Sequence, residues 1–387
     1  MPITNATPVA APIPGSTPSP VYVFEGTIQA EQPLATASAD LIARERADKH
    51  KALPIPTTHL KDGVHLMFPA TGLKGKIRRC ARDVVRNAMM EKTGNVHPLS
   101  LDEHYLLTLG GIKGKGEQQR SSISQEQHWR TANPLLSLFG AGDAGFLGFM
   151  QGRLSIGNAI AENNIDLTPA TILGSGVRSD DFYRDKEQVQ YLSNSDVSTL
   201  ITRAEGGRDK SQINKQIKTL TSSLIKARKK AQSSQSEEDA QAVLTLTEEI
   251  AALTQEKDDV STATGTSDVS ISMPLPGWKA IPAGTVMNHK MIGHRLTPVE
   301  LGLLLKSLAH FALQEARVGA HLAAGCGEIS AQWEVFEVTS SGKKSVGSVT
   351  LKPWDAAHID GALLHSSIQA FEDFIASDVA SFVIPHA

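Results

Sequence analysis

The sequence has few of the features that mark secreted, membrane-embedded or zinc-stabilised proteins. Only two of its 387 residues are cysteines, and Cys80 and Cys326 both lie among small or apolar residues. We therefore expect reduced thiols in a core, with no disulfide and no structural zinc site. No run approaches the about 18 uninterrupted apolar residues of a membrane span. Residues 1–20, rich in Pro, Ala, Thr and Ser, lack a signal-peptide pattern. These absences predict a cytoplasmic protein with a disordered leader over 1–20 and no membrane, metal or cofactor.

Net charge is also low, at −3, so the total predicts no general affinity for polyanions. The distribution is uneven, however. Between Lys74 and Arg120 there are ten Lys and Arg residues against five Asp and Glu residues. Such local asymmetry is typical of proteins that bind nucleic acid or another polyanion.

The most informative segment is 68–86, FPATGLKGKIRRCARDVVR, in which a strand-like lead-in meets a Pro/Gly turn and then a helix. Cations crowd the first helical turn, where the helix macrodipole disfavours them. One interpretation is a solvated helix face; the other is an anion held between the glycine amides and the cations. The helix has one apolar face, formed by Leu73, Ile77, Ala81, Val84 and Ala88. The candidate anion contacts are Lys74, Lys76, Arg78, Arg79 and Arg82.

A second basic segment follows at 110–120, GGIKGKGEQQR. Its glycines would allow a ligand to approach the backbone closely, and its cations would supply charge. A flexible surface loop would have the same composition. The candidate phosphate contacts are Lys113, Lys115 and Arg120.

The remaining pattern predicts an α+β fold built in two halves around an antiparallel sheet. Residues 21–30 have the composition of a first strand, and 297–300 combine an N-cap, a Pro at the first helical position and a capping-box Glu. Residues 208–259 show two amphipathic runs typical of a helical hairpin, with Ser234 and Glu237 as the capping box of the second helix. We expect a first half of the fold over 21–203, an inserted hairpin over 204–265 and a second half over 266–387.

Four sequence motifs, in order along the chain, resemble those of the RAMP superfamily of CRISPR proteins. The resemblance spans roughly residues 21–338. Each motif alone is short and weakly specific, whereas four in matching order are a specific pattern. The motifs are FPATGLKGKIR at 68–78, similar to the superfamily's Leu-Lys-Gly turn; LFG at 138–140 with GRLSI at 152–156; IPAGT at 281–285 with ELG at 300–302; and the glycine-rich stretch from 318 to 329.

Within that superfamily the chain most resembles the Cas-seven-like backbone subunit of class 1 effector complexes, in particular the type IV backbone. The resemblance implies a modified RNA-recognition-motif (ferredoxin-like) palm, a thumb hairpin and helical fingers. It also implies a non-catalytic, RNA-binding protein of antiviral defence. Copies would form a helical filament along a guide RNA (crRNA), with other effector subunits at the filament ends. The target nucleic acid would pair with the guide, DNA being favoured over RNA.

The resemblance also suggests a thumb within 168–200, centred on 172–185. Arg178 and Arg184 would contact phosphates, and Phe182 or Tyr183 would wedge against a base. An ordinary loop with a packed aromatic pair would have the same sequence.

Two catalytic alternatives remain open. Type III relatives cleave target RNA with an aspartate placed after the first strand, where this chain has Asp40 and Asp48 but lacks the usual glycine-rich surroundings. We therefore predict a protein that is not an enzyme, with metal-dependent cleavage of guide-paired target RNA through Asp48 or Asp40 as the alternative function. Guide processing by a general acid–base histidine is the third hypothesis, for which the candidates are His289, His294 and His321.

Overall fold

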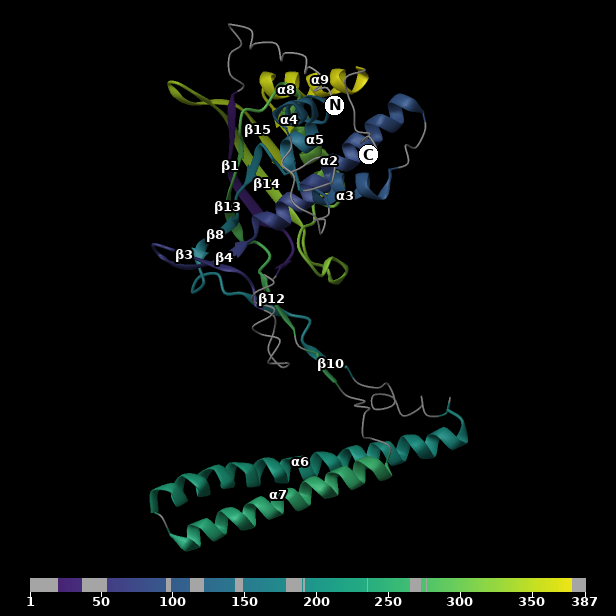
Figure 1. Ribbon diagram of the computed structural model, residues 1–387, viewed down its shortest axis with the longest axis vertical. Helices are drawn as coiled ribbons and strands as arrows, with labels where there is room; N and C mark the ends of the chain where they lie inside the picture. The colour runs from purple at the N-terminus through teal and green to yellow at the C-terminus, as the bar shows by residue number, and fades with distance from the viewer. Residues whose placement is uncertain are drawn as a thin grey trace, which may run out of the picture. The chain divides into compact units, whose positions relative to one another are not determined.

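The chain forms two compact units, shown in Figure 1. In this computed structural model the described residues are 20–36, 54–94, 99–111, 122–142, 149–178, 190, 192–234, 236–264, 273–275 and 277–377. One unit combines Met1–Gly174 with Pro276–Ala387, and the other is Ser175–Leu275. The second unit is therefore an insertion into the first, and it begins earlier and ends later than the 204–265 expected from the sequence.

An antiparallel sheet is the centre of the first unit. Its strands lie in the order β16-β15-β14-β1-β13-β8-β4-β3, with β7 paired to β13. The expected α+β class is thus confirmed. The strands are β1 (Val21–Ala30), β3 (Thr57–Leu60), β4 (Gly63–Phe68), β7 (Leu154–Ile156), β8 (Ala159–Asn164), β13 (Val286–Gly293), β14 (Ile329–Thr339), β15 (Gly342–Leu351) and β16 (His358–Asp360).

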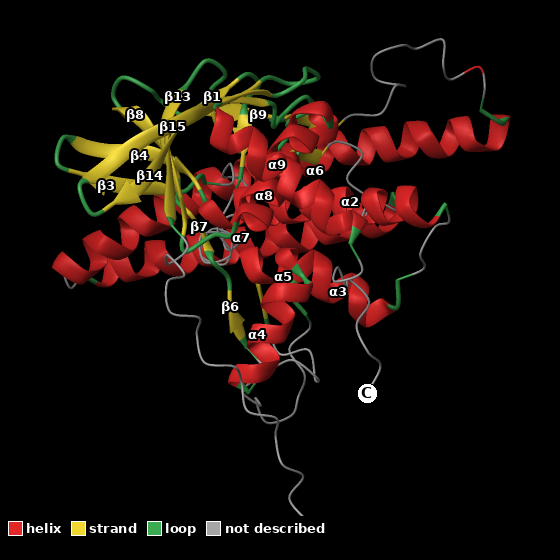
Figure 2. Cartoon of the chain, turned by 90° about the horizontal axis from the view of Figure 1, so that it is seen from above, coloured by secondary structure: helices red, strands yellow, loops and turns green. Residues whose placement is uncertain are grey.

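Helices cover one side of this sheet, as Figures 1 and 2 show together. The long helix α2 (Ala70–Thr93) packs on α8 (Pro298–Leu313), which in turn packs on α9 (Ala362–Ala376). Between them and the sheet lie fully buried side chains such as Phe24, Phe68 and Phe371. The described residues also form three shorter helices: α3 (Leu101–Leu109), α4 (Ile123–Ala132) and α5 (Pro134–Phe139).

The start of α8 follows the sequence prediction. The Thr297 hydroxyl accepts from the Glu300 amide, and the Glu300 carboxylate accepts from the Thr297 amide at 2.7 Å. Glu300 is buried, and Arg153 binds the same carboxylate at 3.0 Å. Because burying an unpaired carboxylate would be costly, Arg153 ties the chain just before β7 to the N-terminus of α8.

Among the described residues there are also three minor sheets. A three-stranded sheet is ordered β2 (Leu34–Ala35), β12 (Trp278–Ile281) and β9 (Thr171–Leu173). Two short ladders join β5 (Gly140–Ala141) to β6 (Met150–Gln151), and β10 (Gly176–Arg178) to β11 (Met273–Leu275).

The second unit consists mainly of a helical hairpin, which confirms the helices expected within 208–259. Its helices, α6 (Asn194–Ser234) and α7 (Glu237–Ala263), are longer than the sequence pattern predicts. Ile213 and Leu224 are buried in their shared seam. The capping box expected from Ser234 and Glu237 is wrong, because α7 begins after Ser236 and the Ser236 side chain makes no capping hydrogen bond.

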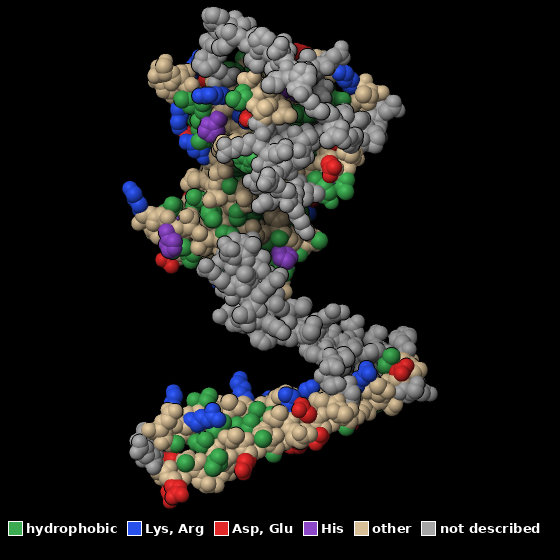
Figure 3. Space-filling view, viewed as in Figure 1, with side chains coloured by type: hydrophobic (Ala, Val, Ile, Leu, Met, Phe, Trp, Pro, Cys, Tyr) green, Lys and Arg blue, Asp and Glu red, His purple; other side chains and the backbone are tan. Residues whose placement is uncertain are grey.

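Charge in this hairpin is divided between its two helices. Helix α6 carries nine Lys and Arg residues against three acidic ones, whereas α7 carries eight Asp and Glu residues and one Lys. Figure 3 shows blue side chains along one helix and red ones along the other. An ion pair between Lys230 and Asp239, at 2.8 Å, lies next to the turn.

The contact between α8 and α9 depends on Gly302. A Cβ atom there would lie 2.0 Å from the Ser367 carbonyl oxygen and 2.9 Å from the Phe371 Cβ. We expect Gly302→Ala to force the helices apart and to lower the free energy of unfolding by about 1–3 kcal/mol, measured by thermal and denaturant unfolding. Gly207→Ala in α6 is the control, since its added methyl meets nothing within 4 Å and favours the helix. Equal stability of the two variants would contradict this close packing.

Candidate nucleic-acid interface

Helix α2 begins without any negative charge to balance its dipole. Its N-cap is Pro69, which has no side chain able to cap, and its first turn contains no acidic residue. The Asn158 side chain accepts from the Ala70 amide at 2.8 Å and satisfies one backbone donor. The predicted apolar face is confirmed, with Leu73 and Ile77 buried against the core. A helix start of this kind favours an anion.

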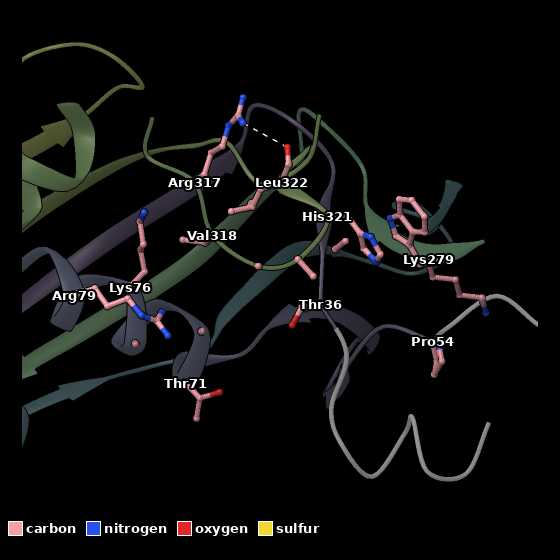
Figure 4. Close-up of a pocket in the computed structure, with 16 residues that line it drawn as sticks. Thr36, Pro54, Thr71, Lys76, Arg79, Lys279, Arg317, Val318, His321 and Leu322 are labelled. Carbon is pink, nitrogen blue, oxygen red and sulfur yellow. Dashed lines mark hydrogen bonds between the residues drawn. The ribbon is translucent and has the colours of Figure 1, made fainter. Parts of the chain in front are cut away.

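A groove of about 690 Å³ lies beside this helix start (Figure 4). Its walls come from the first turns of α2, the end of β2, strand β12 and the loop that precedes β14. The residues that line it are Ala35, Thr36, Pro54, Thr71, Gly72, Gly75, Lys76, Arg79, Trp278, Lys279, Arg317, Val318, Gly319, Ala320, His321 and Leu322.

The described residues that line the groove include four Lys and Arg side chains and no carboxylate. Lys76 and Arg79 come from α2, and Figure 4 shows both side chains on the same wall. Lys279 and Arg79 are exposed, and Lys76 is half-buried. Arg317 differs because it binds Glu328 at 3.1 Å and Glu315 at 3.2 Å. Lys76, Arg79 and Lys279 therefore provide the positive charge that a ligand would meet.

The loop opposite α2 has an unusual backbone. Gly319 has a φ of +88°, and a Cβ on it would lie 2.5 Å from the Ala35 carbonyl oxygen, so only glycine fits there. The Ala320 amide donates to the same carbonyl at 2.8 Å, which fixes the loop to β2. The residues with left-handed φ in this loop are Glu315, Ala316, Gly319, His321, Gly325 and Gly327. Three of these six residues are not glycine, and strained backbone of that kind is found preferentially at ligand sites.

Two aromatic rings stack at the groove. The indole of Trp278 and the imidazole of His321 lie parallel, with centroids 3.7 Å apart and an angle of 8° between their planes. His321 is exposed, and Trp278 is half-buried.

Arg78 has a structural role, contrary to the phosphate contact that the sequence predicts. Its side chain is buried, and its guanidinium donates to the carbonyls of Leu106 at 2.6 Å, Leu107 at 2.8 Å and Gly140 at 3.0 Å. Burial lowers the pKa of Arg78 to about 10, which still leaves the group charged at neutral pH. The Arg78 side chain is thus turned into the protein, while Arg79 next to it faces the groove.

Arg82 and Lys74 are also outside the groove lining. Arg82 lies within 2.8 Å of both Asp83 and Thr108, so its charge is already paired. Lys74 is half-buried, and its pKa is lowered first by burial and then by the charge of Arg78. Of the five cations predicted on α2, the structure brings two, Lys76 and Arg79, into the groove.

Comparison with known proteins finds no matching family model and no matching curated protein. The fold is similar to a solved structure titled "Type IV-B CRISPR Complex". That similarity has a TM-score of 0.40 and 10% sequence identity, and it covers 84% of this chain and 93% of that chain.

Several predicted residues lie outside the described part of the chain. These are Lys113, Lys115 and Arg120 of the second basic segment, Phe182, Tyr183 and Arg184 of the expected thumb, and both aspartates of the ribonuclease alternative, Asp40 and Asp48. Arg178 lies in β10 of the second unit, where only its backbone is described. Their expected roles stay predictions.

The three candidate histidines have different surroundings. His289 is buried and accepts from the Trp333 indole N–H at 3.1 Å, and burial lowers its pKa to about 4. His294 lies 3.2 Å from the Ser155 hydroxyl. His321 lines the groove, where no described carboxylate is available to it. In the described residues no three His, Cys, Asp or Glu side chains are arranged to hold a metal ion, and no helix could cross a membrane.

Sequence reasoning did not single out Lys279, Arg317 and Trp278 as site residues. No local sequence pattern identifies these three residues as part of a site, because the groove brings α2 together with segments about 200 residues or more further along the chain. The available signal was the density of glycine between 319 and 327, which marks a loop of unusual backbone conformation.

The neighbouring pair Arg78 and Arg79 separates folding from binding. Arg78→Ala removes three hydrogen bonds from a charged donor to backbone carbonyls and empties a buried site, so we expect a loss of about 3 kcal/mol or more in the free energy of unfolding. Arg79→Ala removes an exposed side chain and should change that free energy by no more than about 0.5 kcal/mol. Denaturant unfolding of both variants measures the difference. Equal destabilisation by the two would contradict the structural role of Arg78.

Proposed function

We propose that this chain is the non-catalytic backbone subunit of a CRISPR ribonucleoprotein and that it holds guide RNA in the groove beside α2. The observation that carries the proposal is a groove with three accessible cations, a helix start that has no acidic residue in its first turn, and no carboxylate among the described residues of its lining. Such a surface binds phosphate by electrostatic attraction and without reading bases, as a subunit that accepts many guide sequences must do.

The order of the strands supports the palm expected of such a subunit. Strands β14, β1, β13 and β8 are neighbours in that order and antiparallel, while α2 lies between β1 and β8 in sequence and α8 lies between β13 and β14. This is the arrangement of a ferredoxin-like split βαβ fold, to which RNA-recognition motifs belong.

The positions of the sequence motifs support the same proposal. The Leu-Lys-Gly turn at 68–78 and the glycine-rich stretch at 318–329 are more than 200 residues apart, yet both line the groove. Residues of the two middle motifs contact each other through the Arg153–Glu300 ion pair. Further copies along the guide, other effector subunits at the filament ends and a DNA target complete the proposed assembly.

Charge reversal in the groove tests the RNA-binding role. We expect Lys76→Glu, Arg79→Glu and Lys279→Glu together to abolish co-purifying RNA, measured by absorbance and by the length of the extracted nucleic acid. On a plot of the logarithm of binding affinity against the logarithm of salt concentration, each phosphate contact on a single strand contributes about 0.7 to the steepness of the slope. Three lost contacts should therefore reduce the steepness by about 2.

The matched control reverses three exposed lysines that do not line the groove, Lys61, Lys344 and Lys352. It changes net charge by the same amount and should retain RNA. Unchanged RNA content in the groove variant, or equal loss in both variants, would refute the proposed interface.

The absence of catalysis is a separate prediction. The assembled complex, incubated with RNA complementary to its guide and with Mg²⁺ or Mn²⁺, should leave the target strand intact on a denaturing gel. Regularly spaced cuts that disappear in Asp40→Ala or Asp48→Ala would establish the ribonuclease alternative and remove the non-catalytic assignment.

A further inference from the structure

The groove contains a feature that phosphate binding does not require, the stacked rings of Trp278 and His321. The two residues come from β12 and from the loop before β14, which are distant in the sequence. Their parallel geometry, at 3.7 Å and 8°, places the rings in full face-to-face contact.

Strand β9 and the residue that follows it hold the indole of Trp278 in place. Trp278 pairs with Leu173 of β9, and a Cβ on the next residue, Gly174, would lie 2.0 Å from an indole ring carbon. The chain at Gly174 therefore packs directly against the indole, while the imidazole of His321 covers part of the rest. Of the two rings, His321 is the exposed one, and it is among the residues that line the groove in Figure 4.

The backbone at His321 is held in a costly conformation. Its φ of +58° is in the left-handed region, which is unfavourable for a residue other than glycine. Two hydrogen bonds hold the loop on either side, from the Ala320 amide to the Ala35 carbonyl and from the Ala324 amide to the His321 carbonyl at 2.9 Å. A glycine would remove this cost, and what histidine adds at the position is an imidazole ring stacked on Trp278.

A flat ring in a groove that Lys279, Lys76 and Arg79 also line matches one class of ligand, a strand with both phosphates and bases. Metal binding is a weaker explanation, because no metal-ligating cluster exists among the described residues. We propose that the outer face of His321, supported by Trp278, stacks on one base of the RNA in the groove. This inference rests on the proposed function, and it adds a base contact that any of the four bases can make.

Two oligonucleotides distinguish base stacking from phosphate binding: a uridine 12-mer and a 12-mer of abasic ribose phosphate with the same charge. Stacking on an aromatic ring contributes about 1–3 kcal/mol per base, which corresponds to about a 5- to 150-fold change in affinity. We expect His321→Gly to weaken binding of the uridine 12-mer by a factor in that range and to leave binding of the abasic 12-mer unchanged. Glycine is the chosen replacement because it tolerates the left-handed backbone.

Two further variants complete the experiment. His321→Phe keeps a ring and should restore preference for the uridine 12-mer, whereas Lys279→Ala should weaken both oligonucleotides by the same factor. Thermal unfolding of each variant shows whether the loop remains folded. Equal effects of His321→Gly on both oligonucleotides, or no effect on either, would overturn the stacking contact. If the unchanged protein binds neither oligonucleotide, the proposed function fails instead.

Discussion

The geometry of the groove depends on the buried guanidinium of Arg78. A buried charge is costly unless its donors are all used, and Arg78 uses its nitrogens on three backbone carbonyls. Two of those carbonyls end α3 and one belongs to β5. The same interaction therefore fixes the rotation of α2 about its axis. With that rotation fixed, Arg79 and Lys76 lie on the groove side and the apolar stripe lies in the core.

The motifs that resemble one family serve two physical purposes. Some keep backbones close: Gly140 and Gly152 face each other, so that a Cβ on either would lie within 2.6 Å of the other segment, and Gly302 allows α8 to approach α9. Others form the groove, including the turn before α2 and the loop around Gly319. Motif residues are thus divided between supporting the scaffold and shaping the site.

Much of the fold was predictable because local physics decides it. Strand β1 and the cap at Thr297 have the bounds and contacts that their residue patterns indicate. The choice among cations on α2 was not predictable, because Arg78 and Arg79 are adjacent and chemically identical, and only tertiary packing determines which one is buried. The set of residues that line the groove was likewise not predictable from the sequence, because Lys279 and His321 are brought near α2 only by long-range strand pairing.

The division of charge in the hairpin has a mechanical consequence. A rod with positive residues along one side and negative residues along the other has a transverse electric dipole. Near a polyanion such a rod experiences a torque that turns α6 toward the polyanion and α7 away from it. Screening at physiological salt limits this torque to distances of about 8 Å. The division of charge would therefore influence the orientation of the hairpin only when a polyanion lies close to it.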